Sequence, residues 1–221
     1  MNSKIISVRG YGNLKVSPNL IIIDFVIEVE NKSYDKAYEI YKDALKRFNE
    51  TIILSGFSKK DLKTKYWNAE PVTRYKDRYN LRNERITEKI IKYKINHSLK
   101  LEFDLNKETL SKILTEISNS EFPLDLNIRY GVKDKESVKN ELLKKTIRDA
   151  KNKAKILVES LGEQLGELKN INYNVNEIGI RHSIPIQAEL NSLNAEKTHF
   201  NEFEPDDIEF NDDVEVIWTI K

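Results

Sequence analysis

The sequence predicts an α+β domain with a twisted, largely antiparallel sheet and helices packed on one face. Residues 20–30 and 89–103 alternate apolar and polar side chains with the two-residue period of half-buried strands. Three other segments repeat apolar residues at helical spacing. The predicted order from residue 20 is strand, helix, strand, strand, helix, strand, as in ferredoxin-like units. We expect this β-α-β-β-α-β-like core, a third long helix and C-terminal strands to form one domain over residues 1–221.

The composition excludes several classes of protein. The chain has 221 residues, 39% hydrophobic and 33% charged, which is typical of a soluble globular protein. Its formal net charge of +1 provides no overall field that would attract nucleic acid or membrane. The absence of cysteine excludes disulfides, thiolate metal sites and a cysteine nucleophile. No signal-peptide-like segment begins the sequence and no apolar run could span a membrane. We expect a cytoplasmic protein, or an exported one if a signal was removed.

The first candidate motif is a pair of glycines, Gly10 and Gly12, between strand-like residues 5–9 and 14–16. A phosphate-binding loop would need a helix to start directly after the glycines. Here another strand-like run and Pro18 follow instead. We therefore predict a structural turn or bulge in which both glycines adopt positive φ.

The remaining elements follow in order. A helix over residues 37–52 has Asn31 or Ser33 as its N-cap and Gly56 at its C-terminal end. Residues 61–75 read as a turn and a strand, with Pro71 at a sheet edge. Residues 74–88 are polar and read as a hairpin connection.

The second half of the chain contains the most periodic helix. Asn106 caps a short helix, and a strand covers residues 124–130. The long helix over residues 136–161 ends at Gly162, and its apolar stripe, with that of 37–52, should supply most of the core. The predicted stripe of the long helix consists of Val138, Leu142, Leu143, Ile147, Ala150, Ala154, Leu157, Val158 and Leu161. Strands are expected at 168–175 and 214–220, with a long irregular arm over 176–207 between them.

No catalytic, cofactor-binding or metal-binding constellation is evident. His97, His182 and His199 are far apart, and His97 on an apolar strand face reads as a hydrogen-bonded core or interface residue. The acidic segment 202–215 lacks the pattern of a calcium-binding loop. No Gly-x-Ser-x-Gly motif is present, and nothing positions a nucleophile, base and orienting group together. We expect a protein that is not an enzyme and has no cofactor.

Residues 74–94 form a basic hairpin interleaved with tyrosines. Such a segment can track single-stranded nucleic acid, or it can meet the acidic C-terminal segment of a neighbouring subunit. Pairing within one chain is an equal alternative to the subunit contact. Because the chain is nearly neutral, we expect a homo-oligomer first, and second a module that binds a ligand or single-stranded nucleic acid through this hairpin. The candidate contact residues are Trp67, Arg78, Tyr79, Arg82, Phe203, Asp206 and Asp207.

Four stretches together resemble a known family. They are "ISVRGYGNLKVSPN", "SGFSKKDLKTKYWNAEP", "YKINHSLKLEFDL" and "AKNKAKILVESLGEQLGELKNI". In this order they are similar to motifs of the SIMPL-domain family, also known as YggE-like or outer-membrane-immunogen-like proteins. Lys92 stands where the family usually has glycine, and His97 where asparagine is common. The resemblance implies a β-rich α+β fold, a tendency to self-assemble, and roles in stress or at the cell envelope; it brings no catalytic residues and no cofactor.

Overall fold

The computed structural model describes residues 4–79, 85–119, 124–173, 179–181, 186–188 and 204–221. The chain forms two compact units, each assembled from separate segments. Unit 1 comprises Met1–Asn19, Tyr130–Ile184 and Pro205–Lys221, and unit 2 comprises Leu20–Arg129 and Pro185–Glu204. The α+β class and the antiparallel strand pairing are confirmed, with the strands divided over two sheets. That the chain is a single domain stays a prediction.

Unit 2 contains the predicted ferredoxin-like core. Its elements are β2 (Leu20–Asn31), α1 (Tyr34–Leu54), β3 (Lys63–Tyr79), β4 (Arg85–Asp104), α2 (Lys107–Ser118) and β5 (Asp125–Gly131). The sheet order is β3-β4-β2-β5, and the short β8 (Ile186–Ala188) pairs with β5. This is the order that a split β-α-β arrangement requires. Pro71 lies on β3, the terminal strand, where a residue without N–H is tolerated.

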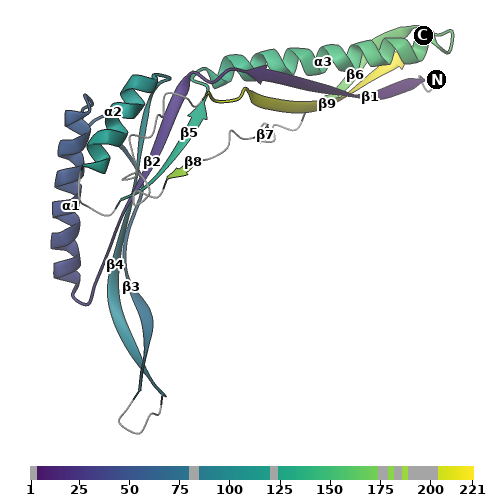
Figure 1. The fold of residues 1–221 in the computed structure, drawn as a ribbon. Helices are drawn as coiled ribbons and strands as arrows, with labels where there is room; N and C mark the ends of the chain where they lie inside the picture. The colour runs from purple at the N-terminus through teal and green to yellow at the C-terminus, as the bar shows by residue number, and fades with distance from the viewer. Residues whose placement is uncertain (1–3, 80–84, 120–123, 174–178, 182–185, 189–203) are drawn as a thin grey trace. The chain divides into compact units, whose positions relative to one another are not determined.

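The two helices of unit 2 cover one face of its sheet (Figure 1). The apolar side chains that alternate along β2, including Phe25, point to this face and are buried. Phe48 of α1 meets Phe25 edge to face, with ring centroids 4.9 Å apart. The helix starts are set by polar residues: the Asn106 side chain accepts a hydrogen bond from the Thr109 N–H at 2.7 Å. The opposite face of the sheet carries mostly polar and charged side chains, as expected for an antiparallel sheet with one solvated side.

Unit 1 packs one long helix against a second sheet. Strand β9 (Ile208–Ile220) lies between β1 (Ile5–Val16) and β6 (Leu165–Asn172), and the short β7 (Gly179–Arg181) also pairs with β9. Helix α3 (Lys135–Glu159) covers one face. Its buried residues recur at every fourth position: Val138, Leu142, Thr146, Ala150, Ala154 and Val158. The small residues in this row allow the helix to approach the sheet closely.

The expectation of a turn at Gly10 and Gly12 is wrong. Strand β1 is continuous and pairs with β9 from Ile5 to Val16 without a register shift. The glycines with positive φ in the described residues are instead Gly56 (φ 100°) and Gly162 (φ 73°), directly after the C-terminal ends of α1 and α3. A Cβ on Gly10 would lie 2.3 Å from the Thr146 carbonyl oxygen. The N-terminal glycines are needed because helix α3 passes directly over the strand.

Two further expectations are corrected. Residues 74–88 are not only a connection, because β3 continues to Tyr79 and β4 begins at Arg85. The predicted apolar stripe of α3 included Ile147, Leu157 and Leu161, but all three are exposed. The row that contacts the sheet follows a four-residue spacing, so it drifts around the helix and leaves these side chains outside. Most of 176–207 lies outside the described residues, although β7 and β8 fall within it.

Candidate interaction site at the β3–β4 ribbon

Beyond the body of unit 2, β3 and β4 continue as a two-stranded antiparallel ribbon (Figure 1). Strand β2 pairs with β4 only as far as Asn31 opposite Tyr93. Residues 72–79 and 85–92, called the ribbon below, therefore have no third strand among the described residues. A two-stranded ribbon by itself is marginally stable in water. Contact with a partner would therefore be expected to stabilise the ribbon.

The register assigns ribbon side chains to two faces. Thr73 is opposite Ile91 and Tyr75 is opposite Lys89, so these four residues share one face, called the Tyr75 face below. Tyr75 is 70% exposed and Ile91 is 55% exposed. They are diagonal neighbours, within reach of one another's long side chains. The opposite face carries Arg74 and Lys76.

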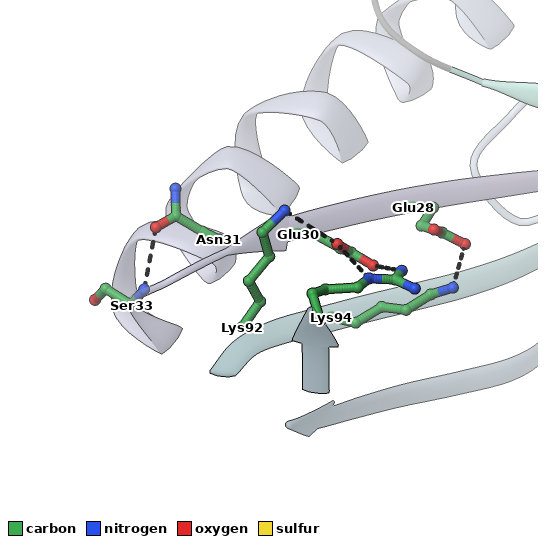
Figure 2. A network of polar contacts seen from close by, with 7 residues as sticks. Glu28, Glu30, Asn31, Ser33, Lys92 and Lys94 are labelled. Carbon is green, nitrogen blue, oxygen red and sulfur yellow. Dashed lines mark hydrogen bonds and ion pairs between the residues drawn. The ribbon is translucent and has the colours of Figure 1, made fainter. Parts of the chain in front are cut away.

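The base of the ribbon is held by ion pairs on the solvated face of the sheet (Figure 2). Glu30 at the end of β2 accepts hydrogen bonds from Arg74 of β3 and, at 3.4 Å, from Lys92 of β4. Lys94 pairs with Glu28 at 2.7 Å. The hydrogen bond from Arg74 is the main reason that the pKa of Glu30 lies below its ordinary value. Glu30 thus joins β2 to both ribbon strands through charge.

An open concavity of about 480 Å³ adjoins this network. Its lining residues come from the end of β2, the start of α1 and β4: Glu30, Asn31, Lys32, Ser33, Lys36 and Lys92. Ser33 is the N-cap of α1, but its side chain makes no capping hydrogen bond. The Asn31 side chain instead accepts a hydrogen bond from the Ser33 N–H at 3.1 Å (Figure 2). The lining is positively charged overall, with Glu30 already engaged by two cations.

Toward its tip the ribbon is held by Asp77. This carboxylate accepts hydrogen bonds from Arg85 at 2.5 Å and from Thr87 at 2.7 Å. The bond from Arg85, followed by the one from Thr87, holds the pKa of Asp77 below its usual range. Arg74, Lys92 and Arg85 are therefore all engaged by carboxylates within the chain. Lys76 and Lys89 are exposed and have no ion-pair partner among the described residues.

An aromatic cluster lies on the helix-covered face at the ribbon's base. Tyr34 contacts Tyr93 edge to face and stacks on Tyr38, which leads through Tyr41 to Trp67 of β3. Tyr34, Tyr38 and Trp67 remain more than 40% exposed. Exposed aromatic groups of this kind are common at protein contacts.

His97 lies beneath this cluster and is 6% exposed. Its Nδ1 is 3.0 Å from the Tyr41 hydroxyl and its Nε2 is 3.0 Å from the Thr64 hydroxyl. A neutral imidazole satisfies both contacts, because each hydroxyl can donate or accept. Burial lowers the pKa of His97 and so favours that neutral form. His97 is thus a hydrogen-bonded core residue.

The residues proposed from sequence as oligomer contacts are spread over the chain. Trp67 is 43% exposed on β3. Arg78 and Tyr79 lie at the described end of β3, while Arg82 and Phe203 fall outside the described residues. Asp206 and Asp207 belong to unit 1 and precede β9, where Asp207 accepts a hydrogen bond from Ser17 at 2.7 Å. The aromatic cluster went unnoticed in the sequence, since helical and strand spacing of tyrosines is also the spacing of an ordinary core.

Metal chemistry finds no support in the described part of the chain, where no group of three or more His, Asp or Glu side chains is placed to hold an ion. His182 and His199 lie outside that part. None of the described helices is long and apolar enough to cross a membrane. What the site offers is an exposed surface for contact with another molecule.

Comparison with protein-family models gives one match that spans nearly the whole chain. Residues 6–218 match the SIMPL model, which is described as a protein of unknown function (DUF541). A search of the curated proteins gives no match. The matched range runs through both compact units.

Proposed function

The chain belongs to the SIMPL family, and we propose that it is a non-enzymatic protein whose copies assemble through the Tyr75 face of the β3–β4 ribbon. The observation that carries this proposal is the exposure of Tyr75 and Ile91 on one face of a ribbon without a third strand. A scaffold or stress-related role belongs to the same proposal.

Packing of the ribbons of two copies against each other would stabilise the ribbon in both copies. When the Tyr75 faces of two copies stack, each covers the tyrosine and isoleucine of the other and removes apolar surface from water. The same contact gives the marginal two-stranded ribbon a second layer. Tyrosine is well suited to this position, because it brings a large contact area and loses little side-chain entropy.

Electrostatics supports an additional contact between copies. Glu209 of β9 is bound by Asn13, and Glu215 is bound by Ser7 and Asn172. These donors are neutral, but Lys15 stands opposite Glu209 and Arg9 opposite Glu215 on β1, so part of the negative charge is balanced within the chain. Lys76 and Lys89 of another copy's ribbon offer the opposite charge, and such patches steer association. Assembly that includes this contact weakens as salt increases.

Binding of single-stranded nucleic acid is the alternative function. The ion pairs of Arg74, Lys92 and Arg85 reduce the charge that the ribbon can offer to phosphates. Titration with a labelled oligonucleotide at low salt tests this alternative directly. A salt-dependent, saturable shift supports it, because phosphate contacts release counterions.

Multi-angle light scattering of the full chain across protein and salt concentrations tests the assembly proposal. The expected mass exceeds that of the 25.9 kDa monomer. The double variant Tyr75→Ser/Ile91→Ser should shift toward the monomer. Tyr66→Ser is the matched control, because Tyr66 is a 52% exposed tyrosine on β3 outside the ribbon. A wild-type chain that is monomeric at every concentration contradicts the proposal.

A further inference from the structure

The outer edge of β3 is a long strand edge that nothing covers in the described part of unit 2. Strand β3 has 17 residues and is terminal in its sheet. From Lys63 to Asp77 its residues are exposed, apart from the half-buried Asn68, Ala69 and Val72. An edge of this length presents a row of backbone donors and acceptors that can template another strand.

The other terminal strands among the described residues are shorter than β3, and two of them are engaged in part. On β1, the Tyr11 N–H donates to the Asp149 carboxylate of α3 at 2.8 Å, so the helix engages that edge at Tyr11. Strand β5 pairs with the short β8 from Leu126 to Ile128. Strand β6 has eight residues, and its pairing with β9 contains register shifts. Short and irregular strands are poor templates for pairing. Strand β3 differs from all of these in length and in its exposed outer side.

Pro71 indicates which backbone groups face outward. A proline within an edge strand normally turns its nitrogen to the outer side, where no ladder hydrogen bond is lost. Backbone groups alternate along a strand, so Thr73, Tyr75 and Asp77 direct their N–H and C=O groups outward as well. The usable outer edge therefore lies between Thr73 and Asp77 and carries the Tyr75 side chain at its centre.

The charges on this edge oppose pairing with a second β3. In a two-fold symmetric antiparallel pair centred on Tyr75, Arg74 would stand opposite Lys76 of the other copy. A pair centred on Arg74 or on Lys76 would place identical cations opposite each other. Like charges directly opposite in a sheet are destabilising. Ribbon stacking through the Tyr75 face, as proposed above, leaves this edge unused.

We propose that the outer edge of β3 is a strand-addition site for an acidic, extended segment of another protein. Backbone hydrogen bonds to Thr73, Tyr75 and Asp77 would supply affinity, and side chains on alternate positions would supply specificity. Acidic residues of the added strand would lie on the face of Lys76, which makes no ion pair among the described residues although Glu88 stands opposite it on β4. Apolar residues would lie on the Tyr75 face. Arg74, Arg85 and Lys92 are engaged by carboxylates within the chain, so Lys76 and Lys89 are the described ribbon cations that an acidic partner would meet.

The probe is a labelled ten-residue peptide that alternates valine and glutamate, titrated with the full chain at low salt and followed by fluorescence anisotropy. It should bind about tenfold or more tightly than a peptide that alternates valine and lysine. A valine–glutamate peptide N-methylated at alternate backbone nitrogens should not bind, because it cannot complete the ladder. Equal binding of the acidic and basic peptides, unimpaired binding of the N-methylated peptide, or no saturable binding would each overturn the inference.

Two variants locate the site. Thr73→Pro removes an outward N–H and should abolish binding of the acidic peptide. Lys76→Glu should weaken it by about tenfold and improve binding of the basic peptide. Circular dichroism checks the fold, and the N-methylated peptide remains decisive if Thr73→Pro does not fold. If Thr73→Pro dissociates the oligomer and no peptide binds, a second copy occupies the edge and the inference is wrong. The Tyr75→Ser/Ile91→Ser variant tests self-assembly separately.

Discussion

Gly12 of β1 lies directly beneath Thr146 of α3, and a Cβ on the glycine would come within 2.2 Å of the Thr146 hydroxyl oxygen. At Gly10 a Cβ would instead meet the Thr146 carbonyl oxygen at 2.3 Å. Thr146 thus leaves no room for a side chain at either glycine. At Gly12 the obstructing atom belongs to the Thr146 side chain, which a substitution can remove, whereas at Gly10 it belongs to the backbone. The close approach of helix and strand in unit 1 depends on the missing side chains.

This difference predicts that Thr146→Ala restores stability in one glycine variant but not in the other. Gly10→Ala and Gly12→Ala should each lower the free energy of unfolding by about 1–3 kcal/mol through overpacking. Thr146→Ala removes the obstructing hydroxyl and should recover part of the loss caused by Gly12→Ala. It should recover none of the loss caused by Gly10→Ala. Urea unfolding of the single and double variants measures these couplings. Equal rescue at both positions would contradict the packing described here.

His97 gives the second prediction, which concerns pH. An unfolded histidine has a pKa of about 6.5, and burial lowers the pKa of His97 in the folded protein. The unfolded chain therefore binds a proton first as pH falls. The stability contributed by neutral His97 is present above about pH 6.5 and is lost as pH falls through the folded-state pKa.

Urea unfolding at pH 7.5 and 5.5 measures this loss, with His97→Phe as the comparison. The variant should lose less stability than the wild type between these pH values. Since His182 and His199 are present in both proteins, the difference isolates His97. An identical pH dependence in the two proteins would show that His97 does not titrate in this range.

The sequence was most informative where one physical signal decided the structure. The alternation of Ile21, Ile23 and Phe25 predicts a half-buried strand because only one face of an antiparallel sheet is covered, and β2 has that pattern. The cap at Asn106 was predictable because its side chain bonds its own helix start. The His97 environment followed from its apolar neighbours on one strand face.

Long-range packing explains what the sequence did not predict. A glycine that avoids a distant helix looks the same in sequence as a glycine in a turn, so Gly10 and Gly12 were misassigned. The polar ribbon lacks the apolar alternation of a covered strand because neither of its faces is buried in unit 2. Its strands are specified by pairing between β3 and β4, which a single-chain pattern does not display.

Glu30 at the ribbon's base gives the third prediction. Glu30→Gln removes the charge that engages Arg74 and Lys92, so amide hydrogen exchange should accelerate in residues 72–79 and 85–92. The global free energy of unfolding should change by less than about 1 kcal/mol, because these ion pairs are solvent-accessible. Glu102→Gln is the matched control, since Glu102 pairs with Lys100 of its own strand. Equal exchange in both variants would mean that Glu30 does not anchor the ribbon.

Acid should have the same effect as Glu30→Gln. The pKa of Glu30 is lowered in the folded protein, chiefly by the hydrogen bond from Arg74. Its contribution is therefore present above the ordinary glutamate pKa of about 4.3 and is lost as pH falls through the lower folded-state value. Ribbon exchange, corrected for the intrinsic pH dependence of amide exchange, should accelerate on acidification in the wild type. It should change less in Glu30→Gln.

Asp149 gives the fourth prediction, which concerns the protected edge of unit 1. Its carboxylate accepts hydrogen bonds from the Tyr11 N–H at 2.8 Å and from Lys153 at 2.6 Å. Lys153 also lies over the Tyr11 ring, 4.8 Å from its centroid. Asp149→Ala leaves the outward Tyr11 N–H without this acceptor. We expect a loss of about 1 kcal/mol in the free energy of unfolding and new association through the β1 edge.

The matched control is Lys153→Ala, which keeps the carboxylate on the Tyr11 N–H. Light scattering of both variants in the Tyr75→Ser/Ile91→Ser background separates β1 association from ribbon assembly. Only for Asp149→Ala should the average molar mass then rise with protein concentration, because only that variant leaves the outward Tyr11 N–H without its acceptor. If both variants associate equally, the lysine and its contact with Tyr11 protect the edge, and the hydrogen bond to Asp149 does not.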